Sequence, residues 1–432
     1  MLRCARNDGV RQFPSVPWRA PSAVMVHGSL HASLRAQRSN PGILQHDLCS
    51  GPDKTSPLAL IAVDSLEQRR AVAVSPGQIH RLGTAMTDLS IDARLLAPDN
   101  NRNRSNMPVV AVAAAALLLG ALVLTTTITW RQGALFLVGG GLGLSLYHAL
   151  FGFTSAWRVF IVARRGAGLR AQMVMLAIAV VLFFPALAHG TLFGQPVHGE
   201  YGAVSLIDKL GWMPALVLCL VVMAGIYVFT LQVETHSHGE IEPGARTELT
   251  GTRRFLQGPW PLLWGAVALA LGNFATLYLA GRPWGITSAF ALWGSKIAMA
   301  LGADVASWGY WQGARAASLQ QSIFSDITSV MDFGIMLGVL LAAGLAGKFN
   351  PTWRLPLPSL LAAIVGGLLL GYGARLAYGC NIGAYFSGIA SGSLHGWCWL
   401  VAAFIGNIIG TRLRPLFGLT VERGPVPVAK PI

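Results

Sequence analysis

An interrupted apolar stretch near the end of the chain places the strongest constraint on the fold. Residues 366–412 read GGLLLGYGARLAYGCNIGAYFSGIASGSLHGWCWLVAAFIGNIIGTR, two apolar runs around a glycine-rich, partly polar centre. A plain membrane-spanning helix needs about 20 mostly apolar residues. Irregular backbone at membrane depth is tolerated only where protein buries it or a cavity hydrates it. Because transporters build substrate sites from such broken helices, the stretch predicts a membrane transport protein.

The composition agrees with a chain that crosses the membrane many times. Hydrophobic residues make up 53% of the 432 residues and charged residues 12%, whereas soluble domains carry about 25% charged residues. The net charge of +14 predicts no nucleic-acid partner, because 13 of the 32 basic residues lie in residues 1–106 and most others lie between apolar runs. Basic residues in such loops set the orientation of membrane proteins.

Apolar runs recur along residues 107–420 and predict an all-α polytopic membrane protein, with about nine spans or long half-spans and broken or re-entrant helices. The runs are 108–130, 133–151, 170–188, 212–231, 260–280, 284–302, 332–346 and the two halves of the interrupted stretch. Glycines at 139, 140, 141 and 143 predict a flat helix face for close packing.

An internal repeat is expected. Shifting residues 139–168 by 228 positions places them on residues 367–396, and this aligns Gly139 with Gly367, Ala156 with Ala384 and Gly168 with Gly396. Each copy has an apolar span, a small-residue break, a short amphipathic helix, a glycine and another span. Paired interrupted segments in two halves of a chain point to a transporter site with pseudo-symmetry.

The ends of the chain differ from this membrane region. Residues 1–106 are rich in Arg, Ser, Pro and Gln without a sustained helical or strand period, so we expect them to be disordered. We also expect translation to start at Met86 or Met107. Residues 421–432 form a short C-terminal tail.

Cys380 is the leading candidate for substrate contact. It lies in the break between Gly379 and Asn381, with Gly383 close by. A helix that starts there presents backbone N–H groups and a positive dipole end, which favour an anion. A soft thiol suits a soft, polarisable ligand atom, while the N–H groups suit negatively charged oxygen atoms. The alternative is a small buried cysteine that only packs.

Three further residues are candidates for the substrate path. Arg375 attracts a dianion or forms a structural salt bridge with Asp332 or Asp304. His395 binds substrate or carries a proton, or else bonds to backbone at a helix start. Lys296 lines the path or extends to the membrane interface.

No metal site or cofactor is predicted. His236, His238 and Glu240 form only a loose set in a polar loop, which fits a solvated segment better than a metal site. The five cysteines include no CxxC pair.

Four segments resemble the YeeE/YedE family of membrane proteins, the sulphur transport family. They are GYGARLAYGCNIGAYFSGIASGSLHGW, LYHALFGFTSAWRVF, PWGITSAFALWGSKIAMALGADVASW and SVMDFGIMLG, spread over residues 107–420. The resemblance implies import of thiosulfate along a path with cysteines. This chain has Phe151-Gly152-Phe153 where relatives often carry Phe-Cys-Phe, so it lacks one cysteine of such a relay.

The favoured function is passage of a small inorganic sulfur anion, such as thiosulfate, through a neck at Cys380 and Asn381 in the cell inner membrane. The sequence carries no Walker A motif and no hydrolase motif, so neither ATP drive nor an enzyme is predicted. Two alternatives stay open. One is a membrane redox subunit that relays sulfur as a persulfide on Cys380 to a soluble cytoplasmic sulfur carrier, and the other is a scaffold that transports nothing.

Deleting residues 1–85 should leave membrane insertion and thiosulfate uptake unchanged, because this segment lacks an apolar face with which to dock. Membrane fractionation and an uptake assay on the shortened protein measure both. Loss of membrane-integrated protein would contradict the prediction.

The loop at residues 158–170 should lie in the cytoplasm, because Arg158, Arg164, Arg165 and Arg170 cluster there. A single cysteine at Ala167, in a background without the native cysteines, should resist an impermeant thiol reagent added to intact cells. Labelling from outside would show the opposite orientation.

Overall fold

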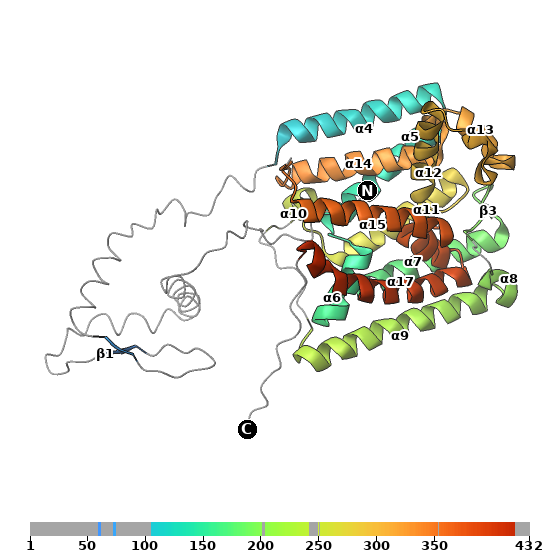
Figure 1. Cartoon of the computed structure of the whole chain (residues 1–432). Coiled ribbons are helices and arrows are strands. Elements are labelled where there is room, and N and C mark those ends of the chain that lie inside the picture. The colour runs from blue at the N-terminus through green and yellow to red at the C-terminus, as the bar shows by residue number, and fades with distance from the viewer. Residues whose placement is uncertain are drawn as a thin grey trace. The chain divides into compact units, whose positions relative to one another are not determined.

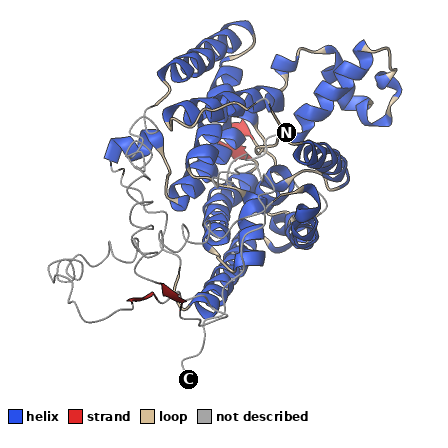
Figure 2. Ribbon diagram, turned by 60° about the vertical axis from the view of Figure 1, so that its left-hand side comes forward, coloured by secondary structure: helices blue, strands red, loops and turns tan. Residues whose placement is uncertain are grey.

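The computed structural model describes residues 59–61, 72–74, 105–200, 204–241, 249, 251–352 and 354–419. Nearly all of the membrane region is helical (Figure 2). The predicted N-terminal extension lies outside the described residues, apart from residues 105–106 and two antiparallel strands, β1 (Ala59–Ile61) and β2 (Val72–Val74). These strands fall in a unit separate from that of the membrane region. The predicted tail at residues 421–432 also lies outside the described residues.

Within the described residues, eight segments are long and apolar enough to cross a membrane, which confirms an all-α polytopic fold. The long helices lie side by side, from α4 at one edge to α9 at the other (Figure 1). They are α4 (Met107–Thr127), α5 (Trp130–His148), α7 (Ala167–His189), α9 (Trp212–His238), α11 (Leu262–Ala280), α14 (Ile327–Leu345), α15 (Leu357–Leu376) and α17 (Leu394–Leu413).

Shorter elements connect or interrupt these helices. The helical ones are α6 (Phe153–Ala163), α8 (Leu206–Leu210), α10 (Gly251–Gln257), α12 (Thr287–Ala300), α13 (Ala316–Gln320), the π-helix η5 (Asn381–Ser387) and α16 (Gly388–Ala390). Five 3₁₀ turns and one hairpin complete the fold: η1 (Val305–Ser307), η2 (Gly309–Trp311), η3 (Gly313–Arg315), η4 (Ile323–Ser325), η6 (Arg414–Phe417), β3 (Thr191–Leu192) and β4 (Gln195–Pro196).

The run at residues 284–302 forms α12, which is a half-span. With 14 residues and a rise of about 1.5 Å per residue, α12 is shorter than the roughly 30 Å hydrocarbon core of a bilayer. The described residues therefore contain eight helical segments long enough to span, beside this shorter helix and the short helices at the two breaks.

Four of the helices, α4, α5, α8 and α14, begin where a polar side chain accepts a hydrogen bond from one of the first backbone N–H groups. The Asn106 side chain accepts from Val109 N before α4, and the Asp326 side chain accepts from Ser329 N at 2.8 Å before α14. Such caps contribute about 1 kcal/mol each. They fix the positions at which apolar helix replaces loop.

The two ends of the helix bundle are fixed by contacts between distant segments. Asn106 N donates to Gly344 O at 2.8 Å, so α4 starts where α14 ends, and we call this the Asn106 end. The opposite end is the Arg282 end, where Arg282 donates to Thr328 at the start of α14. Since α5 runs back to the Asn106 end and α15 starts from it, α5 and α15 cross the bundle in opposite directions.

Glycines bring α5 and α14 into close contact. A Cβ atom at Gly139 or Gly143 would clash with the backbone carbonyl of Met331 or Ile335, respectively. In return, a Cβ at Gly334 or Gly338 would clash with the carbonyl of Phe136 or Gly140, respectively. The two facing small-xxx-small pairs let the helix backbones touch. The predicted packing face is confirmed at positions 139, 140 and 143, whereas Gly141 faces open space.

Replacing Gly143 by alanine should destabilise the protein by about 1–3 kcal/mol, because the added methyl would overpack the α5–α14 contact. Thermal unfolding in detergent measures this loss. Gly141→Ala is the matched control on the same helix, since nothing lies within 4 Å of its added methyl. Equal unfolding temperatures for the two variants would contradict the close contact.

Candidate functional site

The predicted break is present between α15 and α17. After α15 ends at Leu376, Tyr378 adopts a φ of 53° and Gly379 a φ of 144°. The second value is accessible essentially only to glycine. A Cβ at position 379 would also lie 2.8 Å from Ala384 N. Gly379 therefore permits the turn that places Cys380 in extended backbone ahead of η5.

Cys380 is buried at the start of the π-helix. Its relative exposure is 6%, and its thiol contacts the backbone of Ile382 and Gly383. Its carbonyl accepts from Ala384 N at 2.8 Å. The segment thus surrounds a thiol with backbone polar groups inside the protein, the kind of environment that can hold a small anion.

Asn381 and Gly383 face less crowded surroundings than Cys380. Both are half-buried, and a Cβ added at Gly383 would meet nothing within 4 Å. Gly383 therefore has room for a side chain, whereas Gly379 does not. A side chain at position 383 would project into open space near the Cys380 thiol.

The predicted internal repeat is confirmed by backbone conformation. Leu150 (φ 49°) and Tyr378 (φ 53°) are both left-handed and lie 228 positions apart, as do Arg164 (φ 56°) and Gly392 (φ 73°). These pairs bound α6 in the first half and the η5–α16 segment in the second. Because α5 and α15 run in opposite directions, the halves form an inverted repeat, an arrangement that many transporters share.

The short helices of the two halves meet through Gln172, which is fully buried on α7. Its Nε2 donates to the carbonyl of Phe153 at 3.0 Å. Its Oε1 accepts from Trp157 Nε1 at 2.8 Å and from the Tyr385 hydroxyl at 3.3 Å. Trp157 and Tyr385 are equivalent in the repeat, and their ring centroids lie 5.5 Å apart. The two breaks are therefore joined at one buried polar contact.

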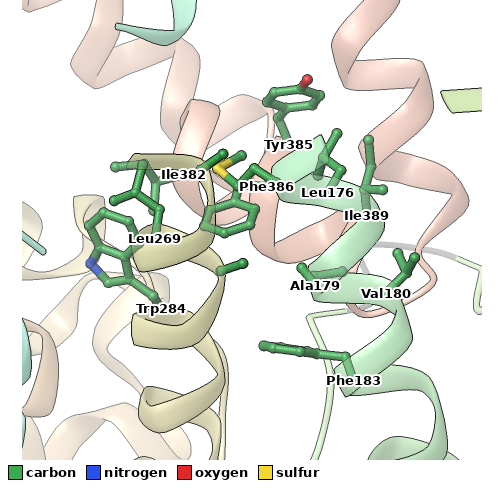
Figure 3. Packing of buried hydrophobic residues seen from close by; sticks show 14 of the residues in the cluster. Leu176, Ala179, Val180, Phe183, Leu269, Trp284, Ile382, Tyr385, Phe386 and Ile389 are labelled. Atoms are coloured by element: carbon green, nitrogen blue, oxygen red, sulfur yellow. The ribbon is translucent and has the colours of Figure 1, made fainter. Parts of the chain in front are cut away.

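A second polar network holds the other side of the η5 segment. Asn273 on α11 accepts from Trp284 N at 2.9 Å and donates to Ser387 at 3.2 Å. Ser387 in turn donates to Trp284 O at 2.6 Å. Figure 3 shows side chains of the η5–α16 segment, such as Phe386, between α7 and the side of the core that carries Trp284. Buried apolar contacts and side-chain hydrogen bonds together support the break.

The first break adjoins a cavity of about 160 Å³, lined by Phe151, Gly152, Ser155, Arg165 and other residues of α6 and α7. This volume exceeds the roughly 30 Å³ of one water molecule several-fold. The Ser155 hydroxyl occupies the space that a Cβ at Gly152 would take. By the repeat, Gly152 corresponds to Cys380, so this cavity lies beside the counterpart of the thiol position.

Arg375 is exposed near the Arg282 end, and hydroxyl groups are its hydrogen-bond partners. It donates to Tyr310 at 2.8 Å and to Thr287 at 3.1 Å. The alternative of a salt bridge with Asp332 or Asp304 is therefore not what the structure has. Arg315 also lies over the Tyr310 ring, with its guanidinium carbon 4.8 Å from the ring centroid, so two guanidinium groups flank this tyrosine.

The structure places the two predicted path residues Lys296 and His395 in different surroundings. The Lys296 ammonium donates to the carbonyls of Leu319 and Gln321, both at 2.7 Å, and so holds the loop before α14. His395 is half-buried in the first turn of α17, with its ring edge-on to Tyr378 at 6.1 Å. His395 thus lies beside the break, whereas the Lys296 ammonium is engaged by loop carbonyls.

The arginine-rich loop is anchored by a buried carboxylate on α9. Glu234 is fully buried, and its oxygens lie 2.7 Å from Arg170 and 3.4 Å from Arg165. Glu234 also accepts from Gly166 N at 3.0 Å. Residues 158–163 belong to α6 and residues 167–170 to α7, so the predicted loop is limited to residues 164–166. These residues lie at the same end of the bundle as the end of α9.

Sequence reasoning did not single out Gln172, Asn273 or Glu234, and it considered Asp332 only as a partner for Arg375. All four are at most 1% exposed. Gln172, Asn273 and Asp332 lie in apolar runs, which was the available signal, since buried polar groups in membranes are costly and often functional. Glu234 lies in the polar stretch of residues 232–238, which offered no such signal.

Comparison with known proteins agrees with these features. The sequence model of the family described as Sulphur transport matches residues 190–409. The chain is 35% identical over 170 residues to "Probable transporter YedE" of Escherichia coli (strain K12), which covers 38% of this chain and 41% of the relative. It is 27% identical over 213 residues to "Thiosulfate transporter TsuA" of Spirochaeta thermophila, which covers 49% and 52%, respectively.

The matched regions span about half or less of these curated relatives. The family model, by contrast, covers half of the chain and includes the break at Cys380. The earlier resemblance to YeeE/YedE proteins is confirmed, and the chain belongs to the sulphur transport family of membrane proteins.

Proposed function

We propose that this protein carries a small sulfur-containing anion, such as thiosulfate, across the cell inner membrane through a neck at Cys380 and Asn381. The observation that carries the proposal is the buried Cys380 thiol at a glycine-permitted break inside an inverted repeat. Relatives named as a probable transporter and as a thiosulfate transporter support the class of substrate.

The anion would enter the neck from the Arg282 end. Arg375 and Arg315 around Tyr310 supply positive charge there, which offsets part of the cost of removing water from a dianion. At the neck, backbone N–H groups hold the oxygens and the Cys380 thiol contacts the terminal sulfur. His395 lies beside this segment and is available for a polar contact with the substrate.

The cavity beside Gly152 would receive the anion after the neck. It lies at the inverted-repeat counterpart of Cys380, and Arg165 on its wall supplies a positive charge. No thiol stands at position 152, so passage here would rest on the Ser155 hydroxyl and Arg165 rather than on a second cysteine. This arrangement permits a substrate preference different from that of relatives with a multi-cysteine path.

The persulfide alternative fits the burial of Cys380 less well. A soluble carrier must reach the sulfur atom directly, whereas Cys380 is only 6% exposed. Burial inside the helix bundle suits a group that a small ion passes. Trapping of a persulfide on Cys380 by a thiol-specific reagent would favour the alternative.

Cys380→Ala should lower the apparent affinity for thiosulfate by roughly 5- to 150-fold, because an unmade buried polar contact costs about 1–3 kcal/mol. Cys380→Ser should lose less and favour oxyanions, and Cys380→Leu should abolish uptake by filling the neck. Radiolabelled uptake into proteoliposomes, at equal amounts of membrane protein, measures all three.

The exposed Cys398 provides the matched control, and Cys398→Ala should transport like the wild type. If Cys380→Ala keeps normal affinity and thiol reagents do not inhibit the wild type, Cys380 only packs. The assignment of the neck would then fail, even where uptake itself is observed.

A further inference from the structure

Asp332 is a carboxylic acid buried in a membrane-spanning helix without a hydrogen-bond partner. It lies in the second turn of α14 with a relative exposure of 1%. Neither of its oxygens has a hydrogen-bond partner within the part of the chain that the structure describes. The other polar residues on this side of α14 do have partners: Thr328 bonds to Arg282 and Ser288, and Ser329 to Trp293. Unlike Thr328 and Ser329, Asp332 therefore has a buried polar side chain that makes no hydrogen bond in the described part of the chain.

Asp332 also lies close to the neck. Its carboxyl group is within electrostatic range of the Cys380 thiol, and both residues are near the Arg282 end of the bundle. Met331 and Ile335, its neighbours on α14, belong to the same buried cluster as Cys380. A negative charge on Asp332 would therefore repel an anion at the neck.

Charged groups on the elements that surround Asp332 do not form a salt bridge with it in the described part of the chain. Helix α14 packs against α4, α5, α10, α12 and η4, and of these α4 and η4 carry no titratable side chain. The titratable groups on the others and beside the helix are Arg131, Tyr147 and His148 of α5, Arg253 and Arg254 of α10, Lys296 of α12, and Arg282, Asp326 and Cys380 nearby. Lys296 is held by loop carbonyls, Arg282 by Thr328, and Asp326 adds a further negative charge near Asp332.

We propose that Asp332 binds a proton that is transported together with the anion, so that protonated Asp332 favours an anion at Cys380 and ionised Asp332 excludes it. The physical reason is that an unpaired carboxylate in a low-dielectric interior is very costly, and neutralising it removes the repulsion toward a dianion. Since linkage is reciprocal, the bound anion favours protonation to the same degree. This inference rests on the proposed function and adds its coupling ion.

The site suits a proton better than a metal cation. A hard cation requires several oxygen ligands, whereas no polar atom lies within hydrogen-bond distance of either Asp332 oxygen in the described chain. The described residues also contain no group of three His, Cys, Asp or Glu side chains that could hold a metal ion. A proton needs only the carboxyl group itself.

Transport in proteoliposomes, with the membrane potential held at zero by potassium and valinomycin, tests the coupling. An inward pH gradient, acidic outside, should drive thiosulfate accumulation by about tenfold per pH unit for each coupled proton. Asp332→Asn stays neutral at all pH values, so the pH gradient should no longer stimulate its thiosulfate uptake. Asp304→Asn, an exposed acid elsewhere in the chain, should behave like the wild type.

The coupling would be overturned if the pH gradient did not change uptake by the wild type, or if it still stimulated uptake by Asp332→Asn. Either result would leave the proposed transport function intact. Stimulation by a sodium gradient instead would likewise overturn the coupling. If the wild type moves no thiosulfate, the proposed substrate fails, and the proton site is then judged separately by infrared spectroscopy. The band of a protonated carboxyl should be present in the wild type at neutral pH and absent in Asp332→Asn, and its absence from the wild type would refute the site.

A calorimetric measurement needs only the wild-type protein. Thiosulfate binding in buffers of different ionisation heat counts the protons taken up with the anion. We expect net uptake of up to one proton for each bound anion at a pH high enough for the infrared band of the protonated carboxyl to be lost from the anion-free protein. Binding without proton uptake at that pH would overturn the linkage even if Asp332→Asn could not be purified.

Discussion

Backbone polar groups that leave a helix at membrane depth must find partners inside the protein, because the hydrocarbon offers none. Among the described helices, such breaks follow α5 and α15. At both breaks the backbone turns through a left-handed residue, Leu150 or Tyr378, and then enters a short buried helix. The side chain of Gln172 ties the two short helices together, and Asn273 supports the second. The arrangement of the long helices provides the buried space in which these contacts form.

The inverted repeat explains how two unlike segments can perform related tasks. The second break presents a buried thiol and the first presents a glycine beside a cavity, at equivalent positions of the repeat. Helix α5 and helix α15 run in opposite directions, and the short helices that follow them contact each other through Trp157 and Tyr385. A path built on both breaks would cross the membrane domain without a wide pore. The close α5–α14 contact places Asp332 within electrostatic range of that path.

Charge is distributed unevenly along the proposed path. Arginines flank Tyr310 at one end, and Arg165 lines the cavity of the first break toward the other. Between them stand a thiol, backbone groups and a carboxylic acid without a bonded partner. An anion would thus be attracted at both mouths and would meet its main barrier near Cys380. The charge on Asp332 would set the height of that barrier.

The sequence alone determined the membrane class, the spans, the break at Gly379 and the repeat offset of 228, because hydropathy and glycine positions act locally along the chain. It also carried the resemblance that the family match confirms. Only the tertiary structure decided which polar residues meet. Arg375 bonds to Tyr310 and Thr287 rather than to Asp332, Lys296 holds a loop, and Gly383 faces open space. Gln172 and Asp332 lie many residues from the breaks that they adjoin, and side-chain contacts over such separations depend on how the helices pack, which no local pattern records.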